Sequence, residues 1–193
     1  MTLYIAITLG MVVAAWFAAV WFLQRYVIWP GQFAPVSAAM PPLERWGVEV
    51  LRLPLDEADP AQGEIEAWFL PGEGVDADNP GPVVIFAHGN GELINHWPGE
   101  LHHYRQQGVS VMLPEYRGYG ASAGSPAVRD IVSDYVRWYD QLTQRDDVNP
   151  TKIIFHGRSI GGGVIGELSR HRKPEAVILE SSFTSIARIA RSF

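Results

Sequence analysis

Residues 151–171 read TKIIFHGRSIGGGVIGELSRH, and this stretch decides the fold. Its first six residues are typical of a buried strand and its last eleven are typical of a helix. Between them, GRSIG at 157–161 has the G-x-S-x-G form and the strand–turn–helix context of a nucleophile elbow. Such a turn strains the serine backbone and leaves no room for neighbouring side chains, which explains the flanking glycines. We therefore predict that Ser159 is a nucleophile rather than part of a structural turn.

A second glycine-containing loop supports this prediction. The apolar run PVVIFA at 82–87 is followed by HGNG at 88–91. A loop in this position can present a backbone N–H toward the elbow. We predict that the backbone N–H groups of Asn90 and Ile160 are the two donors of an oxyanion hole, next to the positive end of the helix that follows. His88 is expected to order the loop by hydrogen bonding rather than to act as a general base.

Strand-like and helix-like segments alternate through the rest of the chain. The predicted strands lie at 47–53, 64–70, 82–87, 109–113, 152–155 and 176–179. The first two alternate polar and apolar residues, as half-buried strands do. Helices are predicted at about 93–107, at about 126–144 with Ser125 as N-cap, and after the elbow. This order indicates an α/β fold, with a mostly parallel sheet covered by helices on both faces.

Residues 3–23, LYIAITLGMVVAAWFAAVWFL, form an uncharged apolar run of 21 residues without proline or histidine. As a helix the run would be about 32 Å long, enough for a hydrocarbon core of about 30 Å. We predict a single transmembrane anchor at 1–26, rather than a cleaved signal peptide or a buried core helix. A linker at 27–42 and a globular domain at 43–193 would follow. The flanking Arg25 favours a cytoplasmic position for that domain.

Composition excludes several classes of function. The chain has 193 residues, 47% of them hydrophobic, which argues against a disordered chain. It has no cysteine, so disulfides, cysteine-ligated metals and a cysteine nucleophile are excluded. A net charge of −6 argues against binding of nucleic acid. The acidic residues of 44–80 read as solvated turns, and the histidines and glutamates of 92–103 match no zinc motif. We predict no metal and no cofactor.

Four motifs in order resemble the α/β-hydrolase superfamily: HGN at 88–90, PEYRGYGASAGSP at 114–126, HGRSIGGG at 156–163 and VILESSFTSI at 177–186. More narrowly, they resemble membrane-anchored α/β-hydrolase domain-containing serine hydrolases of the serine aminopeptidase and lysophospholipase-like branch. The resemblance covers roughly residues 47–190. It implies Ser159 as nucleophile, the amides of Asn90 and Ile160 as oxyanion hole, and a pocket beside the loop at 116–120.

In one respect the chain departs from this family, whose triad runs in the order serine, acid, histidine. Only 34 residues follow Ser159, and His171 is their only histidine. His171 and Glu167 lie about 18 and 12 Å along the helix from the serine, too far for a hydrogen bond to its hydroxyl. Glu180 could face the site, but no histidine would stand between it and Ser159.

Two hypotheses follow from the missing acid and histidine. The first is a serine hydrolase that cleaves ester, thioester or amide bonds of a small-molecule or acylated substrate through an acyl-enzyme on Ser159. The chain would then be the N-terminal two-thirds of a longer hydrolase, and its last strand, at 176–179, an uncovered apolar edge. A pseudoenzyme, or a chain completed by a partner, would also account for the missing residues. The second hypothesis is a non-catalytic, membrane-anchored hydrolase-fold fragment or binding module.

Overall fold

The computed structural model describes residues 2–34 and 43–182. The chain divides into two compact units, residues 1–30 and residues 31–193. The predicted linker at 27–42 lies partly outside the described residues, as does the end of the motif at 177–186.

The first unit consists mainly of helix α1 (Thr2–Ile28), so the helix predicted at 3–23 is present. Its described apolar side chains are exposed, and Trp21 is 65% exposed. Within the described residues, no helix is found that is both long enough and apolar enough to cross a membrane. The structure thus confirms a helix at this place, and its membrane-spanning role stays a prediction. The side chain of Arg25, on which the predicted orientation depends, lies outside the described part.

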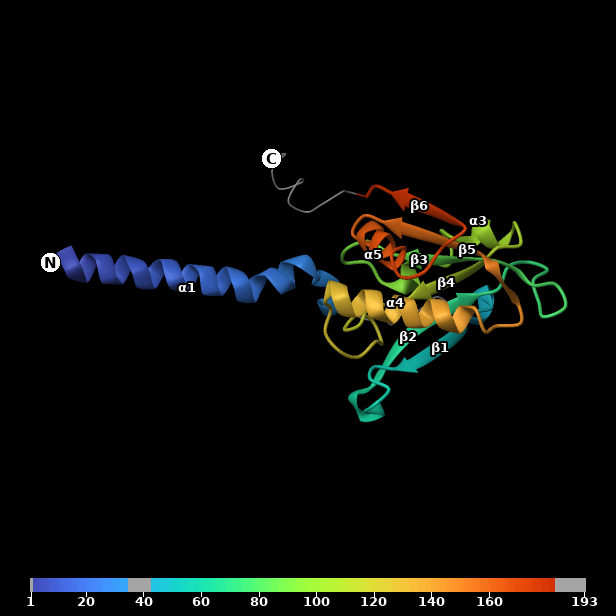
Figure 1. Cartoon of the computed structure of the whole chain (residues 1–193), viewed down its shortest axis with the longest axis horizontal. Coiled ribbons are helices and arrows are strands. Elements are labelled where there is room, and N and C mark those ends of the chain that lie inside the picture. The colour runs from blue at the N-terminus through green and yellow to red at the C-terminus, as the bar shows by residue number, and fades with distance from the viewer. Residues whose placement is uncertain (1, 35–42, 183–193) are drawn as a thin grey trace. The chain divides into compact units, whose positions relative to one another are not determined.

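The second unit is built on a six-stranded sheet with the order β1-β2-β4-β3-β5-β6, shown in Figure 1. The strands are β1 (Glu49–Pro54), β2 (Glu64–Leu70), β3 (Gly81–Ala87), β4 (Ser110–Pro114), β5 (Val148–Arg158) and β6 (Ala176–Glu180). All six predicted strands are confirmed, with bounds shifted by a few residues. The pairs β3–β4, β3–β5 and β5–β6 are parallel, whereas β1–β2 and β2–β4 are antiparallel. Three of these five pairs are parallel, so the sheet is mixed but mostly parallel, as predicted.

The prediction that β2 is half-buried is wrong. Every residue of β2 after Glu64 is buried, including Glu66 and Trp68. The strand lies between β1 and β4, where side chains on both faces are covered. Glu66 tolerates this position because its carboxylate accepts a hydrogen bond from Trp68 Nε1 at 2.9 Å and pairs with Arg52 at 2.8 Å. A paired carboxylate, rather than a solvent-facing one, explains the polar residue in the sequence pattern.

Helices cover both faces of the sheet. Helices α4 (Val128–Leu142) and α5 (Gly161–Leu168) lie side by side, as Figure 1 shows. The other face holds a core cluster formed by Trp68, Leu70, Val84, Phe86, Ile94, Leu101, Val111 and Leu113. The short helices α2 (Leu43–Trp46) and α3 (His102–Arg105) and the 3-10 turns η1 (Pro30–Phe33), η2 (Pro60–Gln62) and η3 (Ile94–His96) complete the described elements.

Two helix predictions need correction. The segment 93–107 is not one helix, because only η3 and the single turn α3 are helical there. Pro98 and Gly99 lie between them, and proline removes a backbone donor while glycine weakens a helix. Helix α4 begins after Ala127 and has no side-chain cap, so Ser125 is not its N-cap.

Candidate active site

The backbone at Ser159 has the geometry of a sharp strand-to-helix turn. Strand β5 ends at Arg158 and helix α5 begins at Gly161. Ser159 has φ +54°, a left-handed conformation that a residue with a Cβ adopts rarely and at some cost. Its N–H donates to the carbonyl oxygen of Glu180 at 2.9 Å, which anchors the turn to the end of β6. The serine is therefore held in a strained turn at the carboxyl ends of the parallel strands.

The glycines around Ser159 permit close backbone contacts. A Cβ on Gly157 would lie 2.6 Å from the carbonyl oxygen of Gly161. A Cβ on Gly161 would overlap the carbonyl oxygen of Ala87, at the end of β3, and one on Gly162 would overlap Ser182 Oγ. These contacts bring the start of α5 against the loop that follows β3, which is the loop predicted to carry the second oxyanion donor.

The loop after β3 is closed by hydrogen bonds on both sides of Asn90. The Gly89 N–H donates to Glu92 Oε2 at 2.6 Å, and the Glu92 N–H donates to the Gly89 carbonyl at 3.4 Å. Gly91, with φ +74°, supplies the left-handed residue of this turn. In the part of the chain that the structure describes, neither the Asn90 N–H nor the Ile160 N–H has an acceptor. Their role as donors of an oxyanion hole stays a prediction.

His88 and Glu115 form a wholly buried pair beneath this loop. His88 Nε2 lies 2.9 Å from Glu115 Oε1, and His88 Nδ1 lies 3.0 Å from the Gly89 carbonyl. Glu115 also accepts hydrogen bonds from the N–H groups of Ile94 and Tyr116, each at 3.1 Å. His88 thus orders the loop, as expected. Because both of its ring nitrogens are engaged and buried, it is not placed to act as a base.

Tyrosines pack against this pair. The Tyr116 hydroxyl donates to the His88 carbonyl at 2.7 Å. Burial, with a smaller contribution from Glu115, raises the pKa of Tyr116 well above its ordinary value. Burial likewise raises the pKa of Tyr119 to about 12. Both phenols therefore stay neutral at physiological pH and serve as packing and hydrogen-bonding groups.

A cluster of charges lies beside the elbow, and sequence reasoning missed it. Arg158 pairs with Glu92 and donates to Glu180 Oε1 at 3.0 Å, and its guanidinium carbon lies 5.4 Å from the centre of the Trp97 ring. The hydrogen bond to Glu180 and the charge of Glu92 raise the pKa of Arg158. The sequence draws attention to Glu92 only as a possible metal ligand. No local pattern could have revealed the pair, because 66 residues separate its members.

The remaining histidines have contacts elsewhere. His156 is 7% exposed, with Nδ1 3.2 Å from the Tyr104 hydroxyl and Nε2 3.4 Å from Glu180 Oε2. Burial lowers the pKa of His156, and Glu180 offsets this in part. His171 lies 3.9 Å from Glu167, both at the exposed surface. None of the six histidines, all within the described residues, hydrogen-bonds Ser159. Among the described residues, the structure therefore places no histidine at Ser159 that could act as its base.

A small cavity of about 30 Å³ lies between the segment 93–95 and the segment 120–121, and Glu66, Trp68 and Glu115 also line it. A space of this size holds one or two water molecules rather than a substrate. In the described part of the chain, no cluster of three or more histidine and carboxylate side chains is arranged to hold a metal ion.

Comparison with known proteins identifies the family. Residues 78–193 match the family described as serine aminopeptidase, S33 (Hydrolase_4). The uncharacterized protein YfhR of Escherichia coli (strain K12) is 35% identical over 150 residues, which are 75% of this chain and 51% of YfhR. The alpha/beta hydrolase domain-containing protein WAV2 of Arabidopsis thaliana is 34% identical over 129 residues, 65% of this chain and 41% of WAV2. The chain spans about half the length of the curated relatives it matches.

Solved structures share the fold. An alpha-beta hydrolase from Vibrio vulnificus superposes with a TM-score of 0.69 at 21% identity, over 88% of this chain and 60% of that one. Thermogutta terrifontis esterase 2, solved after phosphorylation by paraoxon, gives a TM-score of 0.54 at 19% identity, over 74% and 58%. At these identities the likeness establishes the α/β-hydrolase fold alone.

Proposed function

The chain belongs to the serine aminopeptidase, S33, family of α/β hydrolases, and from this premise we propose that it is a serine hydrolase that cleaves ester, thioester or amide bonds through a covalent acyl-enzyme on Ser159. The observation that carries the proposal is the left-handed backbone of Ser159, in a turn whose Gly161 packs against the start of the loop that holds Asn90. The Asn90 and Ile160 N–H groups have no acceptor among the described residues. Strain of this kind persists where the surrounding structure holds it, and it clusters at active sites.

In the proposed reaction, Ser159 Oγ attacks the substrate carbonyl carbon and passes its proton to a general base, which then gives that proton to the leaving group. The carbonyl oxygen becomes an oxyanion, and the N–H groups of Asn90 and Ile160 donate to it. The intermediate collapses when the carbonyl bond re-forms and the bond to the protonated leaving group breaks. Water then adds to the acyl-enzyme, and the acid product leaves with Ser159 restored. Each oxyanion donor contributes about 3 kcal/mol of transition-state stabilisation in enzymes of this kind.

The proposal needs a general base, because serine at its ordinary pKa is a weak nucleophile. Residues 183–193 contain neither a histidine nor an acid. We propose that the triad acid and histidine come from a segment or a partner that is not represented in residues 1–193. Experiments on activity therefore use the product of the complete gene.

The test is labelling by a fluorophosphonate probe, which reacts with activated serines. We expect the complete protein to be labelled, the Ser159→Ala variant to lose labelling, and a Ser133→Ala variant to keep it. Ser133 is an exposed serine of α4 and serves as the matched control. Labelling that survives Ser159→Ala contradicts the assignment. A folded wild-type protein that is never labelled favours the alternative, a non-catalytic binding module of hydrolase fold.

Membrane attachment through residues 3–23 remains part of the proposal, and the observation that supports it is the exposure of apolar side chains along α1. Tyr4, Leu9, Trp16 and Trp21 are each at least 60% exposed. A single-pass anchor would hold the site near lipid, which favours apolar acyl groups in the substrate. A cytoplasmic position of the domain is the orientation we propose.

A further inference from the structure

We infer that the ion pair between Arg158 and Glu92 positions the two N–H donors of the oxyanion hole relative to each other. The inference rests on the proposed function and deepens it, because it assigns a positioning role to two side chains outside the triad. Arg158 occupies the variable position before Ser159 in the elbow motif, and Glu92 lies in the loop after β3.

Glu92 uses its two carboxylate oxygens for different partners. Oε2 accepts the Gly89 N–H at 2.6 Å, and Oε1 pairs with Arg158 Nη1. A Cβ on Gly89 would lie 2.9 Å from Glu92 Oε2, so a side chain there would displace the carboxylate from this position. The carboxylate therefore closes the turn that contains Asn90 and, with its other oxygen, ties that turn to the elbow.

Arg158 is itself held on two further sides. Its Nε donates to Glu180 Oε1 at 3.0 Å, and its guanidinium group lies over the Trp97 ring. Glu180 belongs to the end of β6, and its carbonyl oxygen accepts the Ser159 N–H. A planar guanidinium fixed by two carboxylates and a ring has a defined orientation. Glu92 thus pairs with a rigid group rather than with a freely moving side chain.

The spacing along the chain makes the pair a link between the two donors. Asn90 lies two residues before Glu92, and Ile160 lies two residues after Arg158. The ion pair therefore connects the segment that carries the Asn90 N–H to the segment that carries the Ile160 N–H, and each donor lies two positions from a member of the pair. At the floor of the site the loops are already fixed, because Gly161 packs against the Ala87 carbonyl. The ion pair supplies the second point of attachment that orientation requires.

The partial exposure of Arg158 and Glu92 indicates that their ion pair orients the N–H donors more than it stabilises the fold. The side chains of Arg158 and Glu92 are 35% and 24% exposed. Ion pairs at such positions contribute little to the free energy of folding. A displacement of a catalytic group by about 1 Å, by contrast, can reduce a rate by about 100-fold. Loss of the pair should therefore slow acylation while leaving the fold intact.

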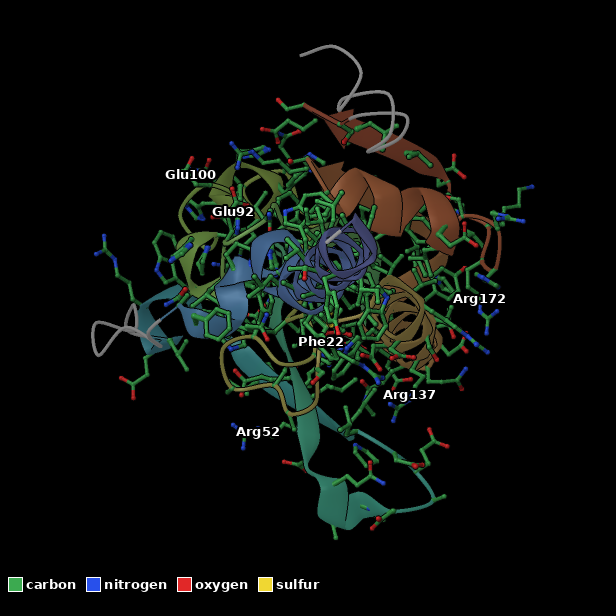
Figure 2. All side chains as sticks on the ribbon, turned by 90° about the vertical axis from the view of Figure 1, so that its left-hand side faces the viewer. Phe22, Arg52, Glu92, Glu100, Arg137 and Arg172 are labelled. Carbon is green, nitrogen blue, oxygen red and sulfur yellow. The ribbon has the colours of Figure 1, made fainter. Side chains whose placement is uncertain are left out.

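The test compares variants of the complete protein by the kinetics of fluorophosphonate labelling. Glu92→Gln keeps an oxygen for the Gly89 N–H but removes the charge that faces Arg158, and Arg158→Gln removes the other charge. The matched control is Asp140→Asn, which breaks an exposed pair with Arg172 at 2.6 Å. Figure 2 shows Arg172 on the opposite side of the view from Glu92.

We expect each single variant to lower kinact about tenfold or more, while KI stays within about twofold, because the oxyanion donors act mainly in the transition state. The double variant Glu92→Gln/Arg158→Gln should be no slower than the slower single variant, since both remove one interaction. Arg158→Lys, which keeps the charge, should recover part of kinact. Asp140→Asn should leave kinact and KI unchanged, and urea midpoints should be similar throughout.

Three results would overturn the inference: an unchanged kinact in Glu92→Gln, a loss in the double variant that equals the product of the single losses, or an Arg158→Lys variant as slow as Arg158→Gln. These results leave the proposed function intact. A wild-type protein that the probe never labels overturns the proposed function instead, so the two failures are distinguishable.

Discussion

Gly161 and Gly163 lie two positions apart in α5, yet only the first has no room for a side chain. A Cβ on Gly161 would overlap the Ala87 carbonyl oxygen, whereas a Cβ on Gly163 would meet nothing within 4 Å. We expect Gly161→Ala to lower the free energy of unfolding by about 3 kcal/mol through overpacking. Gly163→Ala should raise it by up to about 1 kcal/mol, because alanine favours a helix. Urea unfolding measures both, and equal midpoints would contradict the close contact.

The same residue scale shows which parts of the site a sequence can predict. The elbow is local: a strand, a serine between glycines and a helix are adjacent in the chain, so their geometry follows from their order. The contact of Arg158 with Glu92 joins the end of β5 to the loop that follows β3. It depends on the order of strands in the sheet, which places β3 next to β5, and no spacing in the sequence reports that order.

At the scale of elements, the apolar pattern located every strand. It gave a wrong prediction for the burial of β2 and for a single helix at 93–107. Strand β2 alternates in sequence and is nevertheless buried, because Glu66 is satisfied by Trp68 and Arg52. The segment 93–107 has apolar residues at helical spacing, yet Pro98 and Gly99 divide it. The apolar pattern reports which residues are buried, but the partners that make a buried carboxylate tolerable come from other strands. The break at 98–99, in contrast, was readable from the sequence.

In the described part of the chain, β6 is an edge strand of the sheet, and its side chains are exposed. Val177 is 45% exposed and Leu179 is 58% exposed. At the opposite edge, β1 carries the charges of Glu49 and Arg52, which hinder pairing with another chain. We expect Val177→Lys to slow the aggregation of the chain, measured by light scattering, by adding a charge to the β6 edge.

The control for this change is Val128→Lys, which adds the same charge at a valine of α4 that is 52% exposed. It should leave aggregation as in the wild type, because the residue lies on no strand edge. If both variants slow aggregation equally, net charge rather than the β6 edge governs the process.

At the scale of the whole molecule, two units with different surfaces share one chain. Within residues 31–193, most described apolar side chains of the sheet are buried, whereas the described apolar side chains of α1 are exposed. Exposure of an apolar helix to water is unfavourable, so we expect lipid or a partner protein to cover it. The proposed membrane anchor meets this requirement with the lipid itself.

The proposed anchor makes a prediction about the full chain. When the chain is expressed in cells and the membranes are isolated, the wild-type chain should remain in the membrane fraction after an alkaline carbonate wash. Val12→Arg/Val13→Arg should move it into the supernatant, because an arginine at the centre of a spanning helix costs about 2.5–3.5 kcal/mol. Val128→Arg places the same residue on α4 and should leave the chain in the membrane fraction. A wild-type chain that the wash releases completely would contradict the anchor, and it would do so without bearing on the chemistry proposed at Ser159.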